Sequence, residues 1–268
     1  MKVRLVVSAA ICFAVVIFVS TKRSQSTYSQ TKNPAPTLSQ SEQDLLNEIN
    51  AARAHPQVYA SYLEKLKPMF TGKTYKPSAQ DSFDTQEGWA AVEDAIKFLK
   101  ASKPLGPLSA SQGLYLAALS HVKDQSSTGA TGHRGNDSTF IEERVKPYGT
   151  WQGGIGENLT YGNQSARERL LMWLIDDGFA SRGHRNRLMS SNYKVAGVSC
   201  GSHPEFGSMC VVTLAGGFID VARSKTSTGS GSNAKSQPAS AQSSTSANAN
   251  SKSNATNSNG GKTKPRKL

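Results

Sequence analysis

The sequence predicts one α+β domain, placed between an apolar N-terminal segment and a C-terminal tail of low complexity. Apolar residues recur at helical spacing over much of residues 41–189, and two strand-like segments follow at 194–200 and 209–215. The chain has 268 residues, which suffices for one large domain with tails. We therefore expect the folded part to cover residues 41–220.

Helices are expected before the two strands, each from a run of apolar residues spaced three and four apart. Two of these helices begin with the Ser-x-x-Glu pattern of a capping box, one at Ser39 with Glu42 and one at Ser165 with Glu168. The expected helices cover about residues 41–54, 58–67, 84–99, 108–126, 140–145 and 165–175.

Two connections between these helices are rich in glycine and polar residues. Residues 68–83 contain Gly72 and Pro77 and are expected to form a surface loop. Residues 147–155 are expected to be a turn-rich connection, followed by a brief strand or turn at 156–161. We therefore expect little sheet outside the two C-terminal strands.

The first 20 residues have the features of an export signal. Lys2 and Arg4 precede an apolar run, residues 5–19, and about fifteen apolar residues suit a signal peptide better than a membrane span. The end of the run, Phe18-Val19-Ser20, lacks the small-x-small pattern of a cleavage site, so an uncleaved N-terminal anchor is the alternative. Either form predicts a protein that is secreted or held at the outer face of a membrane.

The positive charge of the chain lies mainly outside the expected domain. The net charge is +12, but five of the 31 basic residues lie in 1–40 and eight lie in 221–268, where there are no acids. The remaining 18 face all 19 acids in 41–220, a net charge of −1. A nucleic-acid-binding domain would need its basic residues on a folded face, so we expect no nucleic-acid partner.

The two segments that flank the domain have compositions that do not favour folding. Residues 21–40 are rich in Ser, Thr, Gln and Pro and are expected to be a linker. Residues 221–268 contain no aromatic residue and are expected to be a disordered basic tail. This tail is either a solvated terminus or an adhesive segment for anionic cell-surface polymers or headgroups.

Cys200 and Cys210 flank the short loop between the two expected strands, whereas Cys12 lies in the apolar N-terminal run. Two cysteines that face each other in an exported chain predict a disulfide. Closing so short a loop would stabilise the fold by about 2–3 kcal/mol. Two small buried thiols are the alternative.

Histidines and acids cluster near the end of the helical region. Glu157, Asp176, Asp177 and His184 lie within 28 residues, and His133 stands upstream in a Gly-rich loop. Carboxylate and imidazole groups hold divalent metals or transfer protons near neutral pH. Two acids at the C-terminal end of a helix are electrostatically unfavourable, which indicates that Asp176 and Asp177 have partners.

Two other histidines are interpreted as structural or solvated. His121 lies on the expected helix 108–126, where a histidine is more often packed than a ligand. His203 lies in the loop between the two strands and is expected to be solvated.

Several short motifs follow one another through the expected domain. In chain order they are Leu45–Arg53, Pro107-Leu108, His133, Gly156–Leu159, Trp173, Gly183–Met189 and Ala196-Gly197-Val198. By their order and spacing, residues 41–220 resemble the superfamily of cysteine-rich secretory proteins, antigen 5 and plant pathogenesis-related proteins, known as the CAP or SCP-like domain. The bacterial and protist branch is the most similar, because of the run from Leu174 to Asp177 before Gly-His-Arg.

This resemblance implies an α-β-α sandwich around a small, mainly antiparallel sheet. It also implies a cleft lined by two histidines, His133 and His184, and two acids, Glu157 and Asp176. The family usually has Glu at the second acid position, so Asp176 is a departure that leaves Asp177 as an alternative.

Two functions are consistent with such a cleft. The first is a non-catalytic binding protein, in which His133 and His184 bind Zn²⁺ or another divalent cation, with Glu157 and Asp176 behind them. Its other ligand would be a lipid, a sterol or a polyanion, as the resemblance implies. A buried polar network without any ligand is the structural alternative.

The second function is a metal-dependent extracellular hydrolase of protease type. Glu157 would be its general base, beside His133 and His184. The sequence contains no Gly-x-Ser-x-Gly elbow and no His-Glu-x-x-His helix, so the binding function is favoured.

Overall fold

A computed structural model describes residues 35–221 of the chain. The expected export signal or anchor, most of the linker and nearly all of the basic tail lie outside these residues. Within them, no helix is both long and apolar enough to cross a membrane.

The expected helices form, with ends shifted by a few residues. Ser39 and Ser165 both stand at the N-cap of a helix, and both predicted capping boxes are present. The helices are α1 (Gln40–Ala54), α2 (Pro56–Glu64), the 3-10 helix η1 (Lys67–Met69), α3 (Trp89–Ala101), α4 (Gln112–Thr128), α5 (Ile141–Arg144), α6 (Ala166–Ile175) and α7 (Gly183–Leu188).

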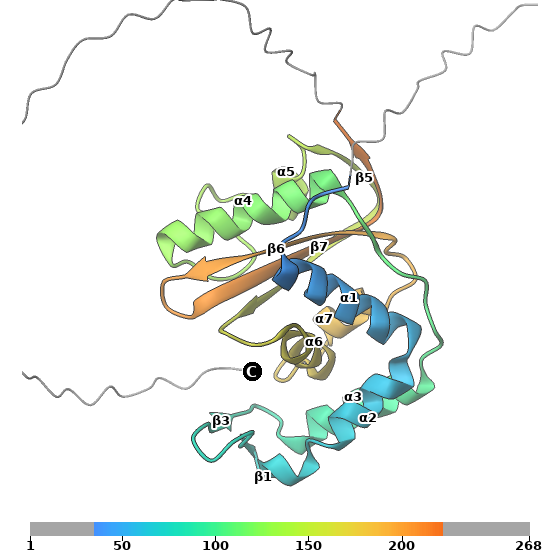
Figure 1. The fold of residues 1–268 in the computed structure, drawn as a ribbon, viewed down its shortest axis with the longest axis vertical. Coiled ribbons are helices and arrows are strands. Elements are labelled where there is room, and N and C mark those ends of the chain that lie inside the picture. The colour runs from blue at the N-terminus through green and yellow to red at the C-terminus, as the bar shows by residue number, and fades with distance from the viewer. Residues whose placement is uncertain (1–34, 222–268) are drawn as a thin grey trace, which may run out of the picture. The chain divides into compact units, whose positions relative to one another are not determined.

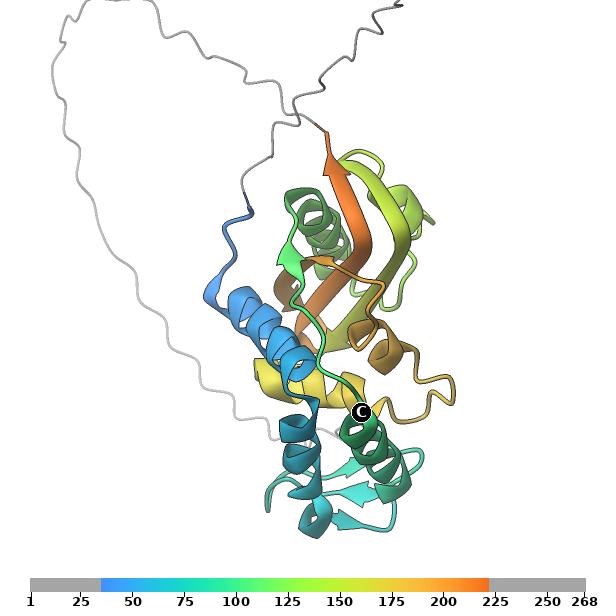
Figure 2. The same cartoon turned by 90° about the vertical axis from the view of Figure 1, so that its right-hand side faces the viewer.

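The main sheet has four strands in the order β4-β6-β7-β5. Strands β5, β6 and β7 are antiparallel to one another, and the short β4 is parallel to β6. Helix α4 covers one face of the sheet, and α1 and α6 cover the other (Figures 1 and 2). The expected α-β-α arrangement is therefore confirmed. The strands are β4 (Ser109–Ala110), β5 (Gly149–Tyr161), β6 (Val195–His203) and β7 (Gly207–Asp220).

Strand β5 is much longer than the sequence indicated. The prediction of a turn-rich connection at 147–155 is wrong, because this segment pairs with β7 over most of its length. A β-bulge interrupts the pairing between Gln152 and Ile155, where Gly153 has φ of 68°. The glycines that looked like turn residues thus supply the bulge of a paired strand.

The predicted loop at 68–83 contains a second, small antiparallel sheet. Its strands are β1 (Phe70–Thr71), β2 (Thr74–Tyr75) and β3 (Phe83–Asp84). Phe70, Tyr75 and Phe83 stand opposite one another in this sheet, and the rings of Phe70 and Trp89 are 5.6 Å apart. Strands of two residues carry too little periodicity to be predicted from sequence.

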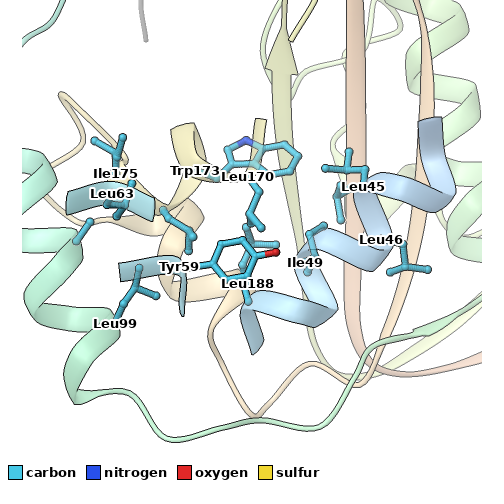
Figure 3. Close-up of a cluster of buried hydrophobic side chains, with 14 of the residues drawn as sticks. Leu45, Leu46, Ile49, Tyr59, Leu63, Leu99, Leu170, Trp173, Ile175 and Leu188 are labelled. Carbon is cyan, nitrogen blue, oxygen red and sulfur yellow. The ribbon is translucent and has the colours of Figure 1, made fainter. Parts of the chain in front are cut away.

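The largest hydrophobic cluster lies between the main sheet and helices α1, α2, α3 and α6 (Figure 3). Leu45, Ile49 and Leu170 are fully buried in it. Arg53 is also buried, and its guanidinium donates to the carbonyls of Gly106, Leu188, Ser190 and Tyr193. Because these carbonyls come from distant parts of the chain, Arg53 joins α1 to the connection after α3 and to the segment after α7.

Helix α4 packs closely on the opposite face of the sheet. A Cβ atom added to Gly197 of β6 would lie 2.0 Å from the backbone of Leu114 in α4. No side chain fits at that distance, so glycine at position 197 lets the helix lie directly on the strand.

Cys200 and Cys210 form the predicted disulfide between β6 and β7. The backbone N–H of Cys200 also donates to the buried Glu42 carboxylate of α1 at 2.9 Å. The other oxygen of Glu42 accepts from the backbone N–H of Ser39 at 2.8 Å. One acidic side chain thus caps α1 and joins its first turn to the sheet.

Candidate functional site

His133 lies in the loop after α4, and its ring meets the carboxylate of Glu157 on β5. His133 Nδ1 and Glu157 Oε1 are 3.0 Å apart. Arg144 of α5 donates to Glu157 Oε2 at 2.6 Å and to the carbonyl of His133 at 2.9 Å. The side chain of His133 is 41% exposed and that of Glu157 only 1%. A surface histidine is thus supported by a buried carboxylate.

The Glu157 carboxylate is ionised and fully engaged in this arrangement. Burial by itself would raise its pKa, but the hydrogen bond from His133 and the positive charge of Arg144 outweigh burial, so the pKa of Glu157 is lowered. Each of its two oxygens accepts from one of these side chains. Glu157 is therefore a stable acceptor that fixes the His133 ring.

His184, in the first turn of α7, forms a similar pair with Asp176. Asp176 Oδ1 lies 2.6 Å from His184 Nδ1, and Oδ2 accepts from the backbone N–H of His184 at 2.8 Å. Asp176 is the C-cap of α6 and has φ of 55°, in the left-handed region. Its side chain is 1% exposed, compared with 18% for His184. This pair also places a buried carboxylate behind a more exposed imidazole.

Asp177 serves a different purpose from Asp176. Its carboxylate accepts from the backbone N–H groups of Gln86 and Glu87, at 2.6 and 2.8 Å. It therefore fixes the segment before α3, and it forms no hydrogen bond or ion pair with a histidine of residues 35–221. Of the two acids that the sequence left open, Asp176 is the partner of His184.

Two consecutive residues of strand β5 contact one histidine each: Glu157 meets the ring of His133, and Asn158 meets the backbone carbonyl of His184. Glu157 and Asn158 are consecutive, so their side chains point to opposite sides of the sheet. Asn158 is fully buried and donates to the carbonyl of His184 at 3.2 Å. Within residues 35–221, no hydrogen bond, ion pair or ring contact joins the His133 pair directly to the His184 pair. Strand β5 is thus the element that the two pairs share.

The donor chemistry of both histidines suits a divalent cation. Each Nδ1 contacts a buried carboxylate, and neither Nε2 has a hydrogen-bond partner in the part of the chain that the structure describes. A carboxylate behind an imidazole fixes its tautomer and leaves the other nitrogen as a metal ligand. Among residues 35–221, there is no group of three or more His, Cys, Asp or Glu side chains that could hold a metal ion.

An aromatic side chain stands exposed beside His184. The ring centroids of Phe179 and His184 are 5.2 Å apart in an edge-to-face arrangement. Phe179 is 54% exposed, although its loop is fixed at both ends. Arg182 N donates to the carbonyl of Phe179, and Arg182 also pairs with Glu87 at 2.6 Å.

Two contacts of the site could not be read from the sequence. Arg144 carries the charge that stabilises Glu157, and in the sequence it is one of three charged residues in the six-residue segment 140–145. Asn158 was visible only as part of the Gly-Glu-Asn-Leu motif, and its contact with His184 spans 26 residues. A contact across that separation cannot be read from local spacing.

The expectation that His203 is solvated is wrong. His203 is 2% exposed, and its Nε2 lies 3.0 Å from the carbonyl of Ala130. Tyr161 and Phe206 pack against its ring. The strand β6 that carries His203 is longer than expected, and this places the ring beside the loop that carries His133.

The chain is similar to three solved bacterial structures. An outer surface protein from Borrelia burgdorferi is 18% identical, with a TM-score of 0.36, and the match covers 47% of this chain and 88% of that one. An extracellular protein with an SCP domain from Bacillus anthracis is 18% identical, with a TM-score of 0.35 and coverage of 57% and 43%. A cysteine-rich secretory protein from Staphylococcus aureus is 15% identical, with a TM-score of 0.29 and coverage of 58% and 48%.

The match thus spans less than half the length of the second and third proteins. No curated protein matches the sequence. The model of the cysteine-rich secretory protein family, CAP, matches residues 46–214, which is more than half of the chain. This range contains every element that carries His133, Glu157, Asp176 and His184. The chain therefore belongs to the cysteine-rich secretory protein family.

Proposed function

We propose that this protein is an exported, non-catalytic binding protein that holds a divalent cation such as Zn²⁺ through Nε2 of His133 and of His184. The observation that carries the proposal is common to both residues. In each, a buried carboxylate contacts Nδ1, while Nε2 has no partner among the described residues. Glu157 and Asp176 would stay behind the imidazoles and hold them in the tautomer that binds metal.

The state of Glu157 favours binding over hydrolysis. A general base must be free to take a proton and needs a pKa near the working pH. Both oxygens of Glu157 already accept hydrogen bonds, and Arg144 and His133 keep its pKa below the ordinary value. A bound cation would supply Lewis acidity and a charge that attracts anionic groups.

The exposed aromatic ring beside His184 favours a lipid or a sterol as the second ligand over a polyanion. Phe179 is more than half exposed on a loop held by ion pairs. Phe140 is 47% exposed, and its ring contacts the guanidinium of Arg134, the residue after His133. One exposed ring beside His184 and another beside the residue that follows His133 suit an apolar ligand with a polar end.

Export is part of the proposal. Residues 1–20 have the composition of a signal peptide or anchor. The Cys200–Cys210 disulfide suits an oxidising compartment, which a secreted or surface-held protein would meet.

Isothermal titration calorimetry with Zn²⁺ tests the cation site. Wild type is expected to bind, and His133→Ala and His184→Ala are each expected to weaken binding at least tenfold, as loss of one ligand does. His55→Ala is the matched control, because His55 is exposed and lies at the junction of α1 and α2, away from both pairs. A variant that carries both substitutions and binds Zn²⁺ as tightly as wild type would exclude the cation site.

A further inference from the structure

The loop that carries His133 has almost no backbone hydrogen bonds of its own. Gly129 N donates to Gln125 O before it, and Gly135 N donates to Thr139 O after it. Between them, no backbone group of residues 130–134 forms a hydrogen bond with another backbone group of the described chain, residues 35–221. Because a loop of this kind is normally mobile, side chains must define its conformation.

Gly132, the residue before His133, is held at both of its backbone groups. Its N–H donates to the Tyr161 hydroxyl at 2.8 Å. Its carbonyl lies 2.6 Å from Gln125 Nε2 and 2.9 Å from His121 Nε2. The Tyr161 hydroxyl in turn donates to Gln125 Oε1 at 2.8 Å. These side chains form a closed network around one peptide, and we name His121, Gln125 and Tyr161 the clamp.

The geometry assigns the tautomer of His121. A nitrogen 2.9 Å from a carbonyl oxygen carries the proton, since two acceptors would repel at that distance. The amide nitrogen of Gln125, 3.1 Å from the same His121 Nε2, then donates to Gly132 O and not to the ring. Nε2–H therefore donates to Gly132 O, and Nδ1 carries the lone pair. His121 is fully buried, and burial lowers its pKa although the Glu157 carboxylate opposes the shift. The ring is accordingly neutral and can keep this tautomer.

Further contacts fix the loop on either side of the clamp. The buried His203 has its Nε2 3.0 Å from Ala130 O. Arg144 donates to His133 O at 2.9 Å and also binds Glu157. The peptides before and after His133 are thus both held, and the His133 side chain, which is 41% exposed, lies between them.

We infer that His121, Gln125 and Tyr161 are positioning residues, which hold the Gly132 peptide so that His133 meets Glu157 through Nδ1 and presents Nε2 to a ligand. The inference rests on the proposed function for the identity of the ligand. The inference that these three side chains hold the Gly132 peptide rests only on their hydrogen bonds. A site fixed in this way loses little entropy on binding, so release of the clamp weakens binding without disrupting the core.

Tyr161→Phe is the sharpest test, because it removes one hydroxyl and keeps the ring contacts with His203 and Phe206. Hydrogen exchange of the Gly132 amide is expected to accelerate roughly three- to tenfold, the factor that one hydrogen bond contributes. The affinity for Zn²⁺ is expected to fall by a similar factor at a temperature where the variant is fully folded. Gln125→Met should act in the same direction, because it removes both polar atoms at similar volume.

Tyr59→Phe is the matched control, since it removes a tyrosine hydroxyl that binds Glu48 on the other side of the sheet. It should leave exchange in residues 131–134 and Zn²⁺ affinity unchanged. If Tyr161→Phe shows the same amide exchange and the same Zn²⁺ affinity as wild type, the positioning role of the clamp is excluded. If wild type binds no Zn²⁺, the proposed function fails, and the exchange measurement still shows whether the clamp holds the loop that carries His133.

Discussion

Asp176 and Asp177 are neighbours with the same side chain, yet they act in different parts of the molecule. The left-handed conformation of Asp176 ends α6 and turns the chain, so the two carboxylates point in different directions. Asp176 then meets His184, and Asp177 meets the backbone before α3. At the scale of single residues, the backbone angle of Asp176 thus assigns the roles.

Replacing each acid by its amide should separate these roles. Asp176→Asn is expected to weaken Zn²⁺ binding by about 10- to 100-fold, because an amide no longer fixes the His184 tautomer by charge. Asp177→Asn should lower thermal stability and leave Zn²⁺ affinity close to wild type. Calorimetry and thermal melts of both variants measure the two effects. Equal losses of Zn²⁺ affinity in Asp176→Asn and Asp177→Asn would contradict the separate roles of the two acids.

At the scale of elements, an ionic cluster joins the connection between α6 and α7 to the start of α3. Arg182 binds Glu87 with both terminal nitrogens at 2.6 Å and Asp94 at 3.1 Å. Arg185 reaches the same Asp94 carboxylate at 2.9 Å. This cluster fixes the loop that presents Phe179, so the exposed ring stands on a rigid support.

The pH dependence of stability should report this cluster. The hydrogen bond from Arg182 lowers the pKa of Glu87 from its ordinary value of 4.5 to about 2. A folded-state pKa below the unfolded value means that the stabilisation is complete above about pH 4.5 and is lost as the pH falls toward about 2. Glu87→Gln should therefore lower the melting temperature at pH 7 and approach wild type near pH 2.

Glu142→Gln is the control for this measurement, because Glu142 is exposed and forms no ion pair among the described residues. It should leave the melting temperature nearly unchanged at each pH. If the melting temperatures of wild type and Glu87→Gln differ by the same amount from pH 7 to pH 2, the ion pair with Arg182 is not the cause of the difference.

At the scale of the whole molecule, the sequence predicted those elements in which apolar residues recur at regular spacing over many residues. The helix periodicity and the two capping boxes predicted α1, α4 and α6 well, because each buries a continuous apolar side. The upstream part of β5, residues 149–155, was missed, since its partners in β7 lie 60 or more residues away in the sequence, as for Ile155 and Ala215. The choice of His133, Glu157, Asp176 and His184 as cleft residues came from the family resemblance. Their pairing, the role of Arg144 and the clamp needed tertiary contacts.

The disulfide should contribute to the stability of the whole domain. Removing it through Cys200→Ser with Cys210→Ser is expected to lower the free energy of unfolding by about 2–3 kcal/mol, the chain-entropy value for so short a loop. Urea denaturation of the oxidised wild type and the double variant measures the difference. Cys12→Ser is the control and should have no effect. Unchanged stability of the double variant would contradict the estimate.

The bulge in β5 also has a consequence for how related chains can vary in length. Side chains alternate along a strand, so one residue more or fewer exchanges the faces of all positions on one side of the change. Between Gln152 and Ile155, β5 already holds one residue more than its partner, which sets the phase of Glu157 and Asn158 relative to the Gly149 end. Homologues that delete Gly153 would lose this extra residue, so the positions upstream of the bulge would exchange faces relative to Glu157 and Asn158.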